Sequence, residues 1–416
     1  MRLDQTVDPQ TTLQENSSGM IGCTVCGNKR LKPFFSIPEL PVDVGRSFAD
    51  ESSALAAPMG NVELVFCHRC SHIFNRQFRS ELITYAPGYE VALYHSPVFR
   101  EFMKTVAQRL IDQFDLRNKT IFEIGAGRGW FLRLLCQLGA NRGFGIDPAV
   151  PLSISCEQEV DHICIYRDYF DARFSERFRL IAPDFICCLS VFEHIPHPWH
   201  MLRELRTMIG SKPTSLYFEI FNAHAAFART EVWSILYEQC SYFTPQSFAW
   251  AFQRAGFRII QSGPCYQGDQ YLFVEAATEG PPPQAVAEDD ECGLDELTIP
   301  AALTQFTQAF ADIQSSWQQR LGQFATAGKK VVFWGAGGKG VSFLNLLPAA
   351  SVIRHVAESN PDKQGKYIPG SGQRIVAPQA LVEIQPDVII LSNRLYEPEI
   401  RQQLETLGLR CDLLVA

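Results

Sequence analysis

Short apolar runs alternate with amphipathic stretches through the middle of this chain. Residues 120–124 and 143–146 are apolar runs of the kind that form buried strands, and 130–138 between them has apolar residues at helical spacing. Further strand-like runs follow at 184–190 and 215–220. Strands that alternate with helices form βαβ units, so this block predicts a parallel sheet covered by helices.

The same order begins again near the carboxyl end. Residues 294–327 carry apolar side chains at helical spacing and predict one long helix, after which we expect a new strand from Lys330. A glycine-rich turn and a second helix come next, followed by strand-like runs at 351–358 and 387–392. This repetition predicts a second, C-terminal Rossmann-like domain.

The remaining segments differ from both blocks in composition. Residues 21–84 combine two cysteine pairs with many Pro, Gly and Ser residues and predict small strands and turns. Three consecutive prolines and an acidic run, EGPPPQAVAEDDECG, predict a solvated linker. The expected α/β organisation is a flexible tail (1–20), a small N-terminal lobe (21–84), a central Rossmann-like domain (85–278), a linker (279–293) and the C-terminal domain (294–416).

Composition narrows the classes of function. Of 416 residues, 46% are hydrophobic and 20% are charged, which is typical of a folded protein large enough for several domains. A net charge of −8 disfavours a nucleic-acid partner, and no apolar run approaches the roughly 18 residues of a membrane helix. Thirteen cysteines, an odd count without a secretory signal, indicate a reducing compartment. We therefore expect a cytoplasmic protein with no nucleic-acid or membrane partner.

Two cysteine pairs in the N-terminal lobe predict a metal site. Cys23 and Cys26 form one C-x-x-C pair, and Cys67 and Cys70 form the other. This spacing lets four thiolates converge on one zinc ion, and a closed set of four leaves no position for water, so we expect a structural zinc. His68 and His72 are alternatives for one ligand, and four incidental free thiols are the remaining reading.

A glycine-rich turn follows the first strand of the central block. The motif places Gly125, Gly127 and Gly129 between that strand and the next helix, and Asp147 ends the following strand 22 positions after Gly125. Such glycines let a ligand approach the backbone, and such an acid can accept hydrogen bonds from both ribose hydroxyls. A dinucleotide and a purely structural turn are alternatives. With Glu123 just ahead, the arrangement resembles the S-adenosylmethionine site of Rossmann-like methyltransferases, in which the acid lies near the methionine moiety.

Further candidates follow at the carboxyl ends of the next strands, where ligands bind open parallel sheets. We expect Asp168 near the adenine amino group, with a helix cap as the alternative, and Ser190 facing the cofactor. His194 lies in the segment VFEHIPHP and is either a structural histidine or a catalytic base.

The order of these features resembles the zinc-containing sugar C-methyltransferases, which methylate ring carbons of nucleotide-linked keto-deoxysugars. The double cysteine pair matches that family's zinc lobe, and residues 332–340, 358–365 and 368–370 resemble parts of its C-terminal domain. The resemblance implies a nucleotide-linked keto-sugar as substrate and a C-terminal domain that helps hold its activated part. The glycine turn 335–340, with Lys339, can bind phosphate, although packing alone is an equal alternative and independent dinucleotide binding is not expected.

This chain departs from the family in one segment. The family carries Tyr-x-Glu-His-x-Ser-Tyr-Phe, whereas residues 236–243 here read LYEQCSYF. Glu238 matches, but Gln239 replaces the histidine proposed as base and Leu236 replaces the tyrosine. An amide has no proton affinity near neutral pH, so Gln239 can orient a substrate but cannot abstract its α proton.

Carbon methylation needs a base and donors that hold an enolate, whereas oxygen methylation needs only a base aligned with the methyl group. The candidate catalytic residues for either route are Glu238, Tyr237, His194 and His224. The candidate substrate-binding residues are Tyr89, with Tyr85 as its competitor, Gln239 and Tyr242. Alternatively, Tyr242 and Phe243 only pack the segment.

These observations predict a methyltransferase that uses S-adenosylmethionine, carries a structural zinc, and methylates carbon in a small nucleotide-linked keto-sugar. Oxygen methylation of a sugar or another small hydroxylated acceptor is the alternative. A cofactor-binding scaffold without chemistry is the second alternative.

Overall fold

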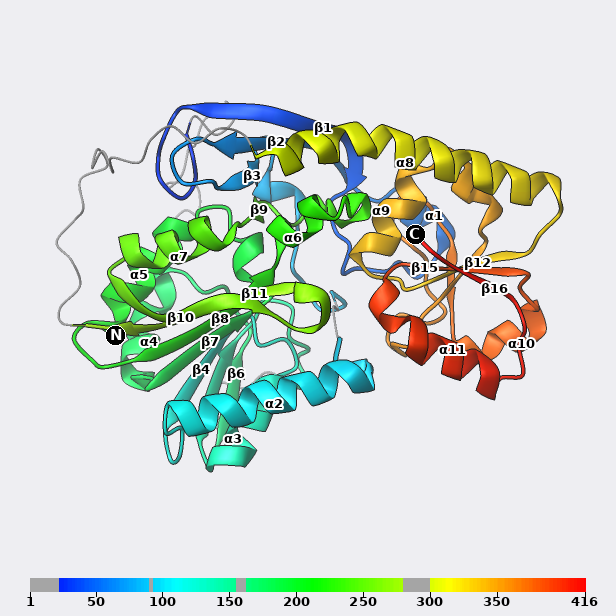
Figure 1. Ribbon diagram of the computed structural model, residues 1–416. Coiled ribbons are helices and arrows are strands. Elements are labelled where there is room, and N and C mark those ends of the chain that lie inside the picture. Colours follow the sequence, from blue (N-terminus) through cyan, green and yellow to red (C-terminus); the bar gives the residue numbers. More distant parts are fainter. Residues whose placement is uncertain (1–21, 90–92, 155–161, 280–299) are drawn as a thin grey trace, which may run out of the picture.

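The computed structural model describes residues 22–89, 93–154, 162–279 and 300–416, and within them the chain forms sheets of seven, five and four strands (Figure 1). The expected tail (1–20) and residues 280–293 of the expected linker lie outside the described residues. Among the helices of the described part, none has both the length and the apolar character needed to cross a membrane.

The seven-stranded sheet is formed by the central block of the chain, with strand order β10-β11-β8-β7-β4-β5-β6. Its strands are β4 (Thr120–Ile124), β5 (Arg142–Ile146), β6 (Ile163–Tyr166), β7 (Phe185–Leu189), β8 (Ser215–Phe221), β10 (Phe257–Cys265) and β11 (Tyr271–Thr278). Neighbouring strands run parallel except at β11, which is antiparallel to both β8 and β10. The strand order reverses between β4 and β7, and an open α/β sheet binds its ligands at that point.

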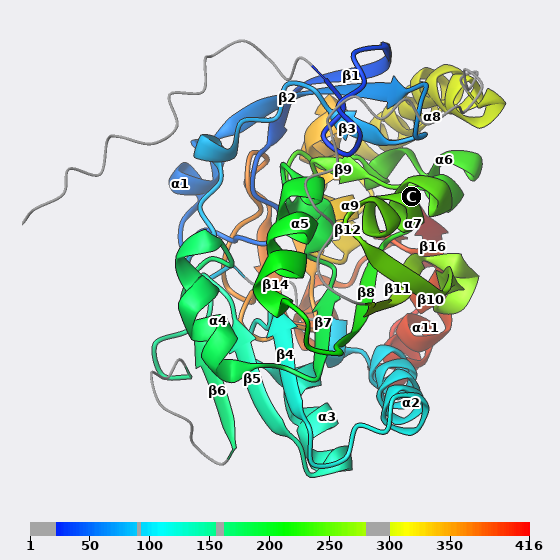
Figure 2. The ribbon, with the colours of Figure 1, turned by 90° about the vertical axis from the view of Figure 1, so that its left-hand side faces the viewer.

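Helices cover both faces of this sheet (Figure 2). One face carries α2 (Pro97–Gln113) and α3 (Trp130–Gly139), and the other carries α4 (Ser175–Ile181), α5 (Pro198–Ile209) and α7 (Pro245–Arg254). The strands are buried on both sides, which explains why they appear in the sequence as continuous apolar runs. Local signals set the helix starts: Ser96 caps α2, and Thr244 forms a capping box at α7.

The five-stranded sheet is wholly parallel, with strand order β14-β13-β12-β15-β16. Its strands are β12 (Val331–Trp334), β13 (His355–Ala357), β14 (Arg374–Val376), β15 (Val388–Leu391) and β16 (Asp412–Val415). Its helices are α9 (Gly338–Leu346), α10 (Leu381–Ile384) and α11 (Glu397–Thr406). In chain order this is 3-2-1-4-5, the same as the parallel part of the central sheet, so the expected second Rossmann-like unit has the topology of a doubly wound fold.

The four-stranded sheet joins distant parts of the chain. Its order is β1-β2-β3-β9, with every pair antiparallel. The elements are β1 (Leu31–Pro41), β2 (Met59–Cys67), β3 (Ile73–Asn75) and β9 (Ser241–Tyr242), with α1 (Glu51–Leu55) between β1 and β2. Because β9 belongs to the LYEQCSYF segment, that segment is tied to the N-terminal sheet.

One apolar core links the N-terminal sheet to the C-terminal unit. The long helix α8 (Ala301–Thr326) lies along β1 in both views (Figures 1 and 2), and the Phe35 ring packs against those of Phe306 and Phe310. The same cluster contains residues of α6 (Ala223–Ala228) and α9. The expected division into separate blocks therefore describes the order of the elements along the chain. The hydrophobic cores, however, contain residues from more than one of these blocks.

Candidate functional site

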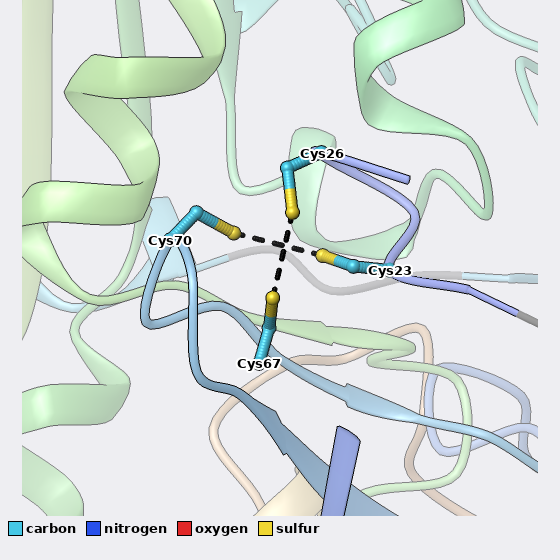
Figure 3. Close-up of side chains that lie close together, drawn as sticks. All are labelled: Cys23, Cys26, Cys67 and Cys70. Atoms are coloured by element: carbon cyan, nitrogen blue, oxygen red, sulfur yellow. Dashed lines mark hydrogen bonds between the residues drawn. The ribbon is translucent and has the colours of Figure 1, made fainter. Parts of the chain in front are cut away.

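The four cysteines of the two C-x-x-C pairs converge on one point (Figure 3). Cys67 ends β2, and the tight turns after Cys23 and Cys67 are closed by backbone hydrogen bonds from Gly27 and Ser71. The sulfur atoms of Cys23 and Cys70 lie 3.6 Å apart, those of Cys26 and Cys67 lie 3.4 Å apart, and all four lie within 4.8 Å of one another.

This geometry fits a tetrahedral metal ion. Zinc–sulfur bonds of about 2.3 Å place the corners of a sulfur tetrahedron about 3.8 Å apart, close to the separations found here. The four thiols are buried, and the described candidates for metal ligation around this point include neither His68 nor His72. The His72 ring instead stacks near Phe74 and approaches the hydroxyl of Ser241 at 3.4 Å.

The glycine turn after β4 has the backbone that its sequence predicts. Gly125, Gly127 and Gly129 have φ angles of +71°, +52° and +72°, in the left-handed region that favours glycine. A Cβ at Gly125 would lie 2.2 Å from Val191, and one at Gly129 would lie 2.4 Å from Ile165. Around Gly127, by contrast, the space within 4 Å of that position is open. The turn therefore packs tightly at its two ends and leaves its middle open to a ligand.

Two acids flank this turn. Asp147 follows β5, and its carboxylate accepts hydrogen bonds from the backbone N–H groups of Gly127 at 2.8 Å and Ala149 at 2.7 Å. Glu123 is buried on β4 and accepts from the Leu132 N–H in the first turn of α3 at 3.1 Å. Burial raises the pKa of Glu123 to about 8, against the lowering effect of that hydrogen bond, and the charge of Asp147 raises it further.

Asp168 and Ser190 lie at the expected strand ends. Asp168 follows β6, is exposed, and accepts a hydrogen bond from the Tyr169 N–H at 2.8 Å. The alternative of a helix cap does not apply to Asp168, because Asp171 caps the next helical turn. Ser190 follows β7 with a φ of +53°, and its N–H donates to the carbonyl of Glu219 at 2.8 Å.

Glu238 lies at the centre of a cluster assembled from distant segments. Its side chain is 2% exposed. The Tyr89 hydroxyl donates to Oε1 at 2.9 Å, and the Val44 N–H donates to Oε2 at 2.9 Å. Burial raises the pKa of Glu238 to about 7, although both hydrogen bonds and the Lys363 charge lower it. Glu238 is therefore a carboxyl fixed by hydrogen bonds, and its pKa is suited to a general base near neutral pH.

Two further charged groups, Asp43 and Lys363, belong to this cluster. Asp43 is 7% exposed and directly precedes Val44. Burial first, and then the charge of Glu238, raise its pKa to about 7, whereas Arg46 and Lys363 lower it. Lys363, which is 6% exposed, comes from the C-terminal unit, where its Nζ donates to the Ala336 carbonyl at 3.0 Å.

His194 lies beside the cluster, and its ring contacts Tyr85. Nδ1 lies 3.3 Å from the Tyr85 hydroxyl, and the ring lies near the main chain of Glu238. Burial lowers the pKa of His194, while the neighbouring Glu193 raises it. The Tyr85 ring packs edge-on against that of Tyr89 at 5.0 Å. Both tyrosines that compete for the substrate-contacting role therefore lie at this site.

Tyr237 and Tyr242 point elsewhere. The Tyr237 hydroxyl accepts from the Arg79 N–H at 2.9 Å, and its ring stacks on Phe78 inside the apolar core. The Tyr242 hydroxyl bonds both the N–H and the carbonyl of Leu236 at 2.9 Å. These bonds and the burial of both side chains favour a packing role, as the packing alternative for Tyr242 states, over the expected catalytic role of Tyr237 and substrate-binding role of Tyr242.

The departure from the family pattern has a structural counterpart. Leu236 packs against Gly338 at the start of α9, where a Cβ would lie 2.6 Å from its Cδ1. Gln239 is 4% exposed, and its Nε2 has no hydrogen-bond partner among the described residues. His224 is exposed in the first turn of α6, and no described hydrogen bond or ring contact joins it to Glu238. Gln239 therefore has a free donor, and His224 is set apart from the cluster.

A cavity of about 190 Å³ lies between the carboxyl ends of the strands of the C-terminal unit and residues 93–96. Gly335, Glu358, Asn360, Lys363, Ser392 and Asn393 contribute to its lining. Glu358 accepts from the Ala336 N–H at 2.8 Å, as Asp147 does from Gly127 in the central unit. Lys339, a candidate phosphate ligand with packing alone as the alternative, forms an ion pair with Glu231 at 2.5 Å. Because the Lys339 ammonium is paired, the groups of this turn that remain as candidates for binding phosphate are its backbone N–H groups.

Comparison with known proteins agrees with this architecture. Residues 99–262 match the family described as a methyltransferase domain, and residues 277–410 match the family described as a C-methyltransferase C-terminal domain. The chain is 24% identical over 391 residues to C-methyltransferase NovU of Streptomyces niveus, covering 91% of this chain and 90% of that protein. The chain is an S-adenosylmethionine-dependent methyltransferase, and its similarity is to C-methyltransferases.

Solved structures of other methyltransferases match only part of the chain. A methyltransferase from Aquifex aeolicus is 13% identical, with a TM-score of 0.32, and the match covers 45% of this chain and 95% of that one. Magnesium protoporphyrin IX methyltransferase from Synechocystis with bound S-adenosylhomocysteine is 14% identical, with a TM-score of 0.34, and covers 46% of this chain and 89% of that one.

Asp43 is not among the residues that the sequence predicts for the site, and Lys363 has no role predicted from the sequence. Asp43 stands in the apolar run PVDVG, and an acid inside such a run is a signal for a buried charge. Lys363 lies in the segment 358–365, and the resemblance of this segment to the family is the only sequence signal that points to it. Its position beside Glu238 depends on the packing of the C-terminal unit.

Proposed function

We propose that this methyltransferase transfers a methyl group to a carbon atom of a nucleotide-linked keto-sugar. The observation that carries the proposal is Glu238, a buried carboxyl fixed by Tyr89 and Val44 with a pKa of about 7. Carbon methylation needs a base that removes a proton from a weak carbon acid, and a carboxyl of ordinary acidity is a poor base for that step. The matches to C-methyltransferases support the same acceptor atom.

In this proposal, Glu238 takes the proton from the carbon next to the keto group. The Gln239 Nε2, which lacks a described partner, and the hydroxyl of Tyr85 are the donors available to hold the enolate oxygen, since the Tyr89 hydroxyl already donates to Glu238. S-adenosylmethionine supplies the electrophilic methyl group. The His194 ring, whose pKa is lowered by burial, contacts the Tyr85 hydroxyl and holds it in place.

The cofactor residues retain their expected roles as part of this proposal. The open space at Gly127, between Gly125 and Gly129, fits a ligand that lies over the turn. Asp147 holds the ribose hydroxyls, Glu123 faces the methionine moiety, and Asp168 and Ser190 border the adenine and the cofactor at the neighbouring strand ends.

The cysteine cluster holds a structural zinc ion in this proposal. Four buried sulfurs with suitable separations support it, and a complete set of four thiolates leaves no coordination position for catalysis.

The cavity at the strand ends of the C-terminal unit is the proposed place for the activated part of the substrate. Lys363 lines this cavity, and its charge also lowers the pKa of Glu238, so this lysine is shared by the cavity and the proposed base. The family resemblance supports a nucleotide as that part. An enzyme with such a substrate belongs to sugar biosynthesis in secondary metabolism or surface-glycan synthesis. We further infer a cytoplasmic location and no nucleic-acid or membrane partner.

Oxygen methylation of a sugar is the second candidate. It is favoured by Gln239 and Leu236, because the family's histidine and tyrosine are both replaced and an alcohol needs no enolate. Glu238 would then deprotonate the attacking hydroxyl. A scaffold without chemistry is not favoured, because it gives no reason to retain a buried carboxyl with raised proton affinity.

Incubation with methyl-labelled cofactor and a panel of nucleotide keto-sugars and their reduced counterparts tests the proposal. NMR then locates the transferred methyl group. A new carbon–carbon bond on a keto-sugar supports carbon methylation, an ether supports the second candidate, and cofactor binding without transfer to any member of the panel supports the scaffold.

A further inference from the structure

Asp43 is a buried carboxyl at the reaction site to which no role has been assigned. It comes from the end of the N-terminal strand pair, immediately before the residue whose N–H binds Glu238. With 7% exposure it is nearly as inaccessible as Glu238. Burial strongly disfavours a charged carboxyl unless the carboxyl is protonated or paired, so the presence of Asp43 here requires an explanation.

The two carboxyls differ in how their oxygens are used. Both oxygens of Glu238 accept described hydrogen bonds, one from Tyr89 and one from Val44. Oδ1 of Asp43 is buried and has no hydrogen-bond partner among the described residues. Asp43 therefore has a buried oxygen that can accept a hydrogen bond from a further donor or carry a proton.

We propose that Asp43 and Glu238 act as one proton-holding pair, in which Asp43 is the positioning partner that sets the proton affinity of the base and Lys363 supplies the counter-charge. This inference rests on the proposed function, in which Glu238 is the base. It adds a residue of the N-terminal segment and one of the C-terminal unit to the proton-transfer site.

Electrostatics supports the pair. Two carboxylates in one buried site do not both ionise readily, so together they retain a proton near neutral pH. Burial raises the pKa of each to about 7, and the Glu238 charge adds to the rise at Asp43. The other groups that face the pair are Arg46 and Lys363, which favour the charged forms, the hydroxyls of Tyr85 and Tyr89, and the His194 ring.

The proton balance of the step follows from this arrangement. The C–H bond next to the keto group breaks, and its proton forms an O–H bond on Glu238. The electron pair left on the substrate forms the bond to the methyl group, whose bond to the sulfonium sulfur breaks, leaving a neutral thioether. The proton then leaves the carboxyl pair to water. This pair supplies what a histidine at position 239 would otherwise supply, a base that is half-protonated near neutral pH.

The first test needs no substrate. Protein labelled with carbon-13 at the carboxyl carbons is titrated by NMR, and the Glu238 signal is assigned as the one missing in Glu238→Gln. In Asp43→Asn, loss of the neighbouring negative charge is expected to lower the Glu238 midpoint by about one pH unit. In Lys363→Met, loss of the positive charge is expected to raise it. A Glu238 midpoint unchanged in Asp43→Asn overturns the pair, whichever acceptor the enzyme methylates.

The second test is the pH profile of kcat/KM for methyl transfer. Asp43→Asn is expected to move the acid limb to lower pH and to reduce the maximal rate by about 10-fold or more, whereas Asp43→Glu retains the wild-type limb. Glu39→Gln removes an exposed carboxyl from β1, four residues before Asp43, and serves as the matched control. Cofactor affinity within about two-fold of wild type shows that a variant is folded.

The two tests separate the two proposals. A wild-type enzyme that methylates no keto-sugar overturns the proposed function but leaves the NMR titration to decide the pair. An Asp43→Asn enzyme with wild-type rate and wild-type acid limb overturns the pair while leaving the proposed function in place.

Discussion

The Tyr89 hydroxyl donates a 2.9 Å hydrogen bond to Glu238, which lies 149 positions later in the chain. Tyr89 precedes the central sheet, whereas Glu238 lies in the segment that β9 ties to the N-terminal sheet. The bond therefore joins two separately placed segments. It also stabilises the charged form of Glu238, since a donor to a carboxylate lowers the pKa of that carboxyl.

Replacement of Tyr89 by Phe is expected to change the pH dependence of the enzyme. Without the donor, the pKa of Glu238 rises, so the base is deprotonated only at higher pH and the acid limb of kcat/KM moves up by about 0.5–1 unit. The deficit is therefore largest at acidic pH. Tyr367→Phe, which changes a tyrosine outside the cluster, is the matched control. A Tyr89→Phe enzyme with a uniform rate loss at all pH values would show that Tyr89 acts on substrate binding instead.

Glu238 and Gln239 are expected to differ in the size of their effects. Glu238→Gln removes the proposed base and should lower turnover by about 10²–10⁴-fold. Gln239→Ala removes an orienting amide and should cost about 10-fold to 100-fold. Near-full turnover in Glu238→Gln would remove Glu238 from the chemistry and direct attention to His194.

The same two variants also distinguish carbon from oxygen methylation. Exchange of the substrate α proton with deuterated water, measured by NMR without methyl transfer, is expected for an enolate route. Exchange lost in Glu238→Gln and retained in Gln239→Ala would identify Glu238 as the base and carbon as the acceptor.

Cofactor binding is expected to tighten as the pH rises. Burial raises the pKa of Glu123 to about 8, so this carboxyl is largely protonated in the empty protein at neutral pH. A cationic methionine moiety nearby favours the charged form, so binding releases a proton and the affinity increases with pH until it levels off above about pH 8. Calorimetry in buffers of different ionisation enthalpy measures this release. In Glu123→Gln the release should vanish; if it persists, another group is its source.

Asp147→Ala is expected to weaken S-adenosylmethionine binding by roughly 1.5–3 kcal/mol, the range for hydrogen bonds to a charged group. Part of the loss would come from the turn itself, because Asp147 also accepts from the Gly127 N–H. Calorimetric titration gives the dissociation constant. An unchanged constant would mean that the ribose is held elsewhere.

One zinc ion per chain is expected at Cys23, Cys26, Cys67 and Cys70. Elemental analysis of undisrupted protein should find close to one equivalent, and a Cys67→Ser/Cys70→Ser variant should lose it. Chelation should unfold mainly the N-terminal segment, because metal binding and local folding are coupled there. Full metal retention in the double variant, or less than about half an equivalent in the wild type, would contradict the four-thiolate site.

Local pattern determined much of this protein. The strands at 120–124, 184–190 and 215–220 formed within one or two residues of their predicted positions, because strands buried on both faces are continuous apolar runs bounded by turns. The glycine turn at 125–129 and its acid at Asp147 were also predictable. A left-handed backbone that a side chain would obstruct restricts the residue type, so it can be read from a single sequence.

Tertiary structure alone decided which side chains reach the reaction site. Tyr237, Glu238 and Gln239 are consecutive, yet Tyr237 points into the apolar core while Glu238 meets Val44 and Tyr89. Similarly, the sequence offers no local reason for Asp43 and Lys363 to act on one carboxyl. Those positions depend on how β9 joins the N-terminal sheet and how the C-terminal unit packs beside it. Contacts between segments more than 100 residues apart depend on the burial of whole surfaces, and that burial cannot be inferred from any short stretch of the chain.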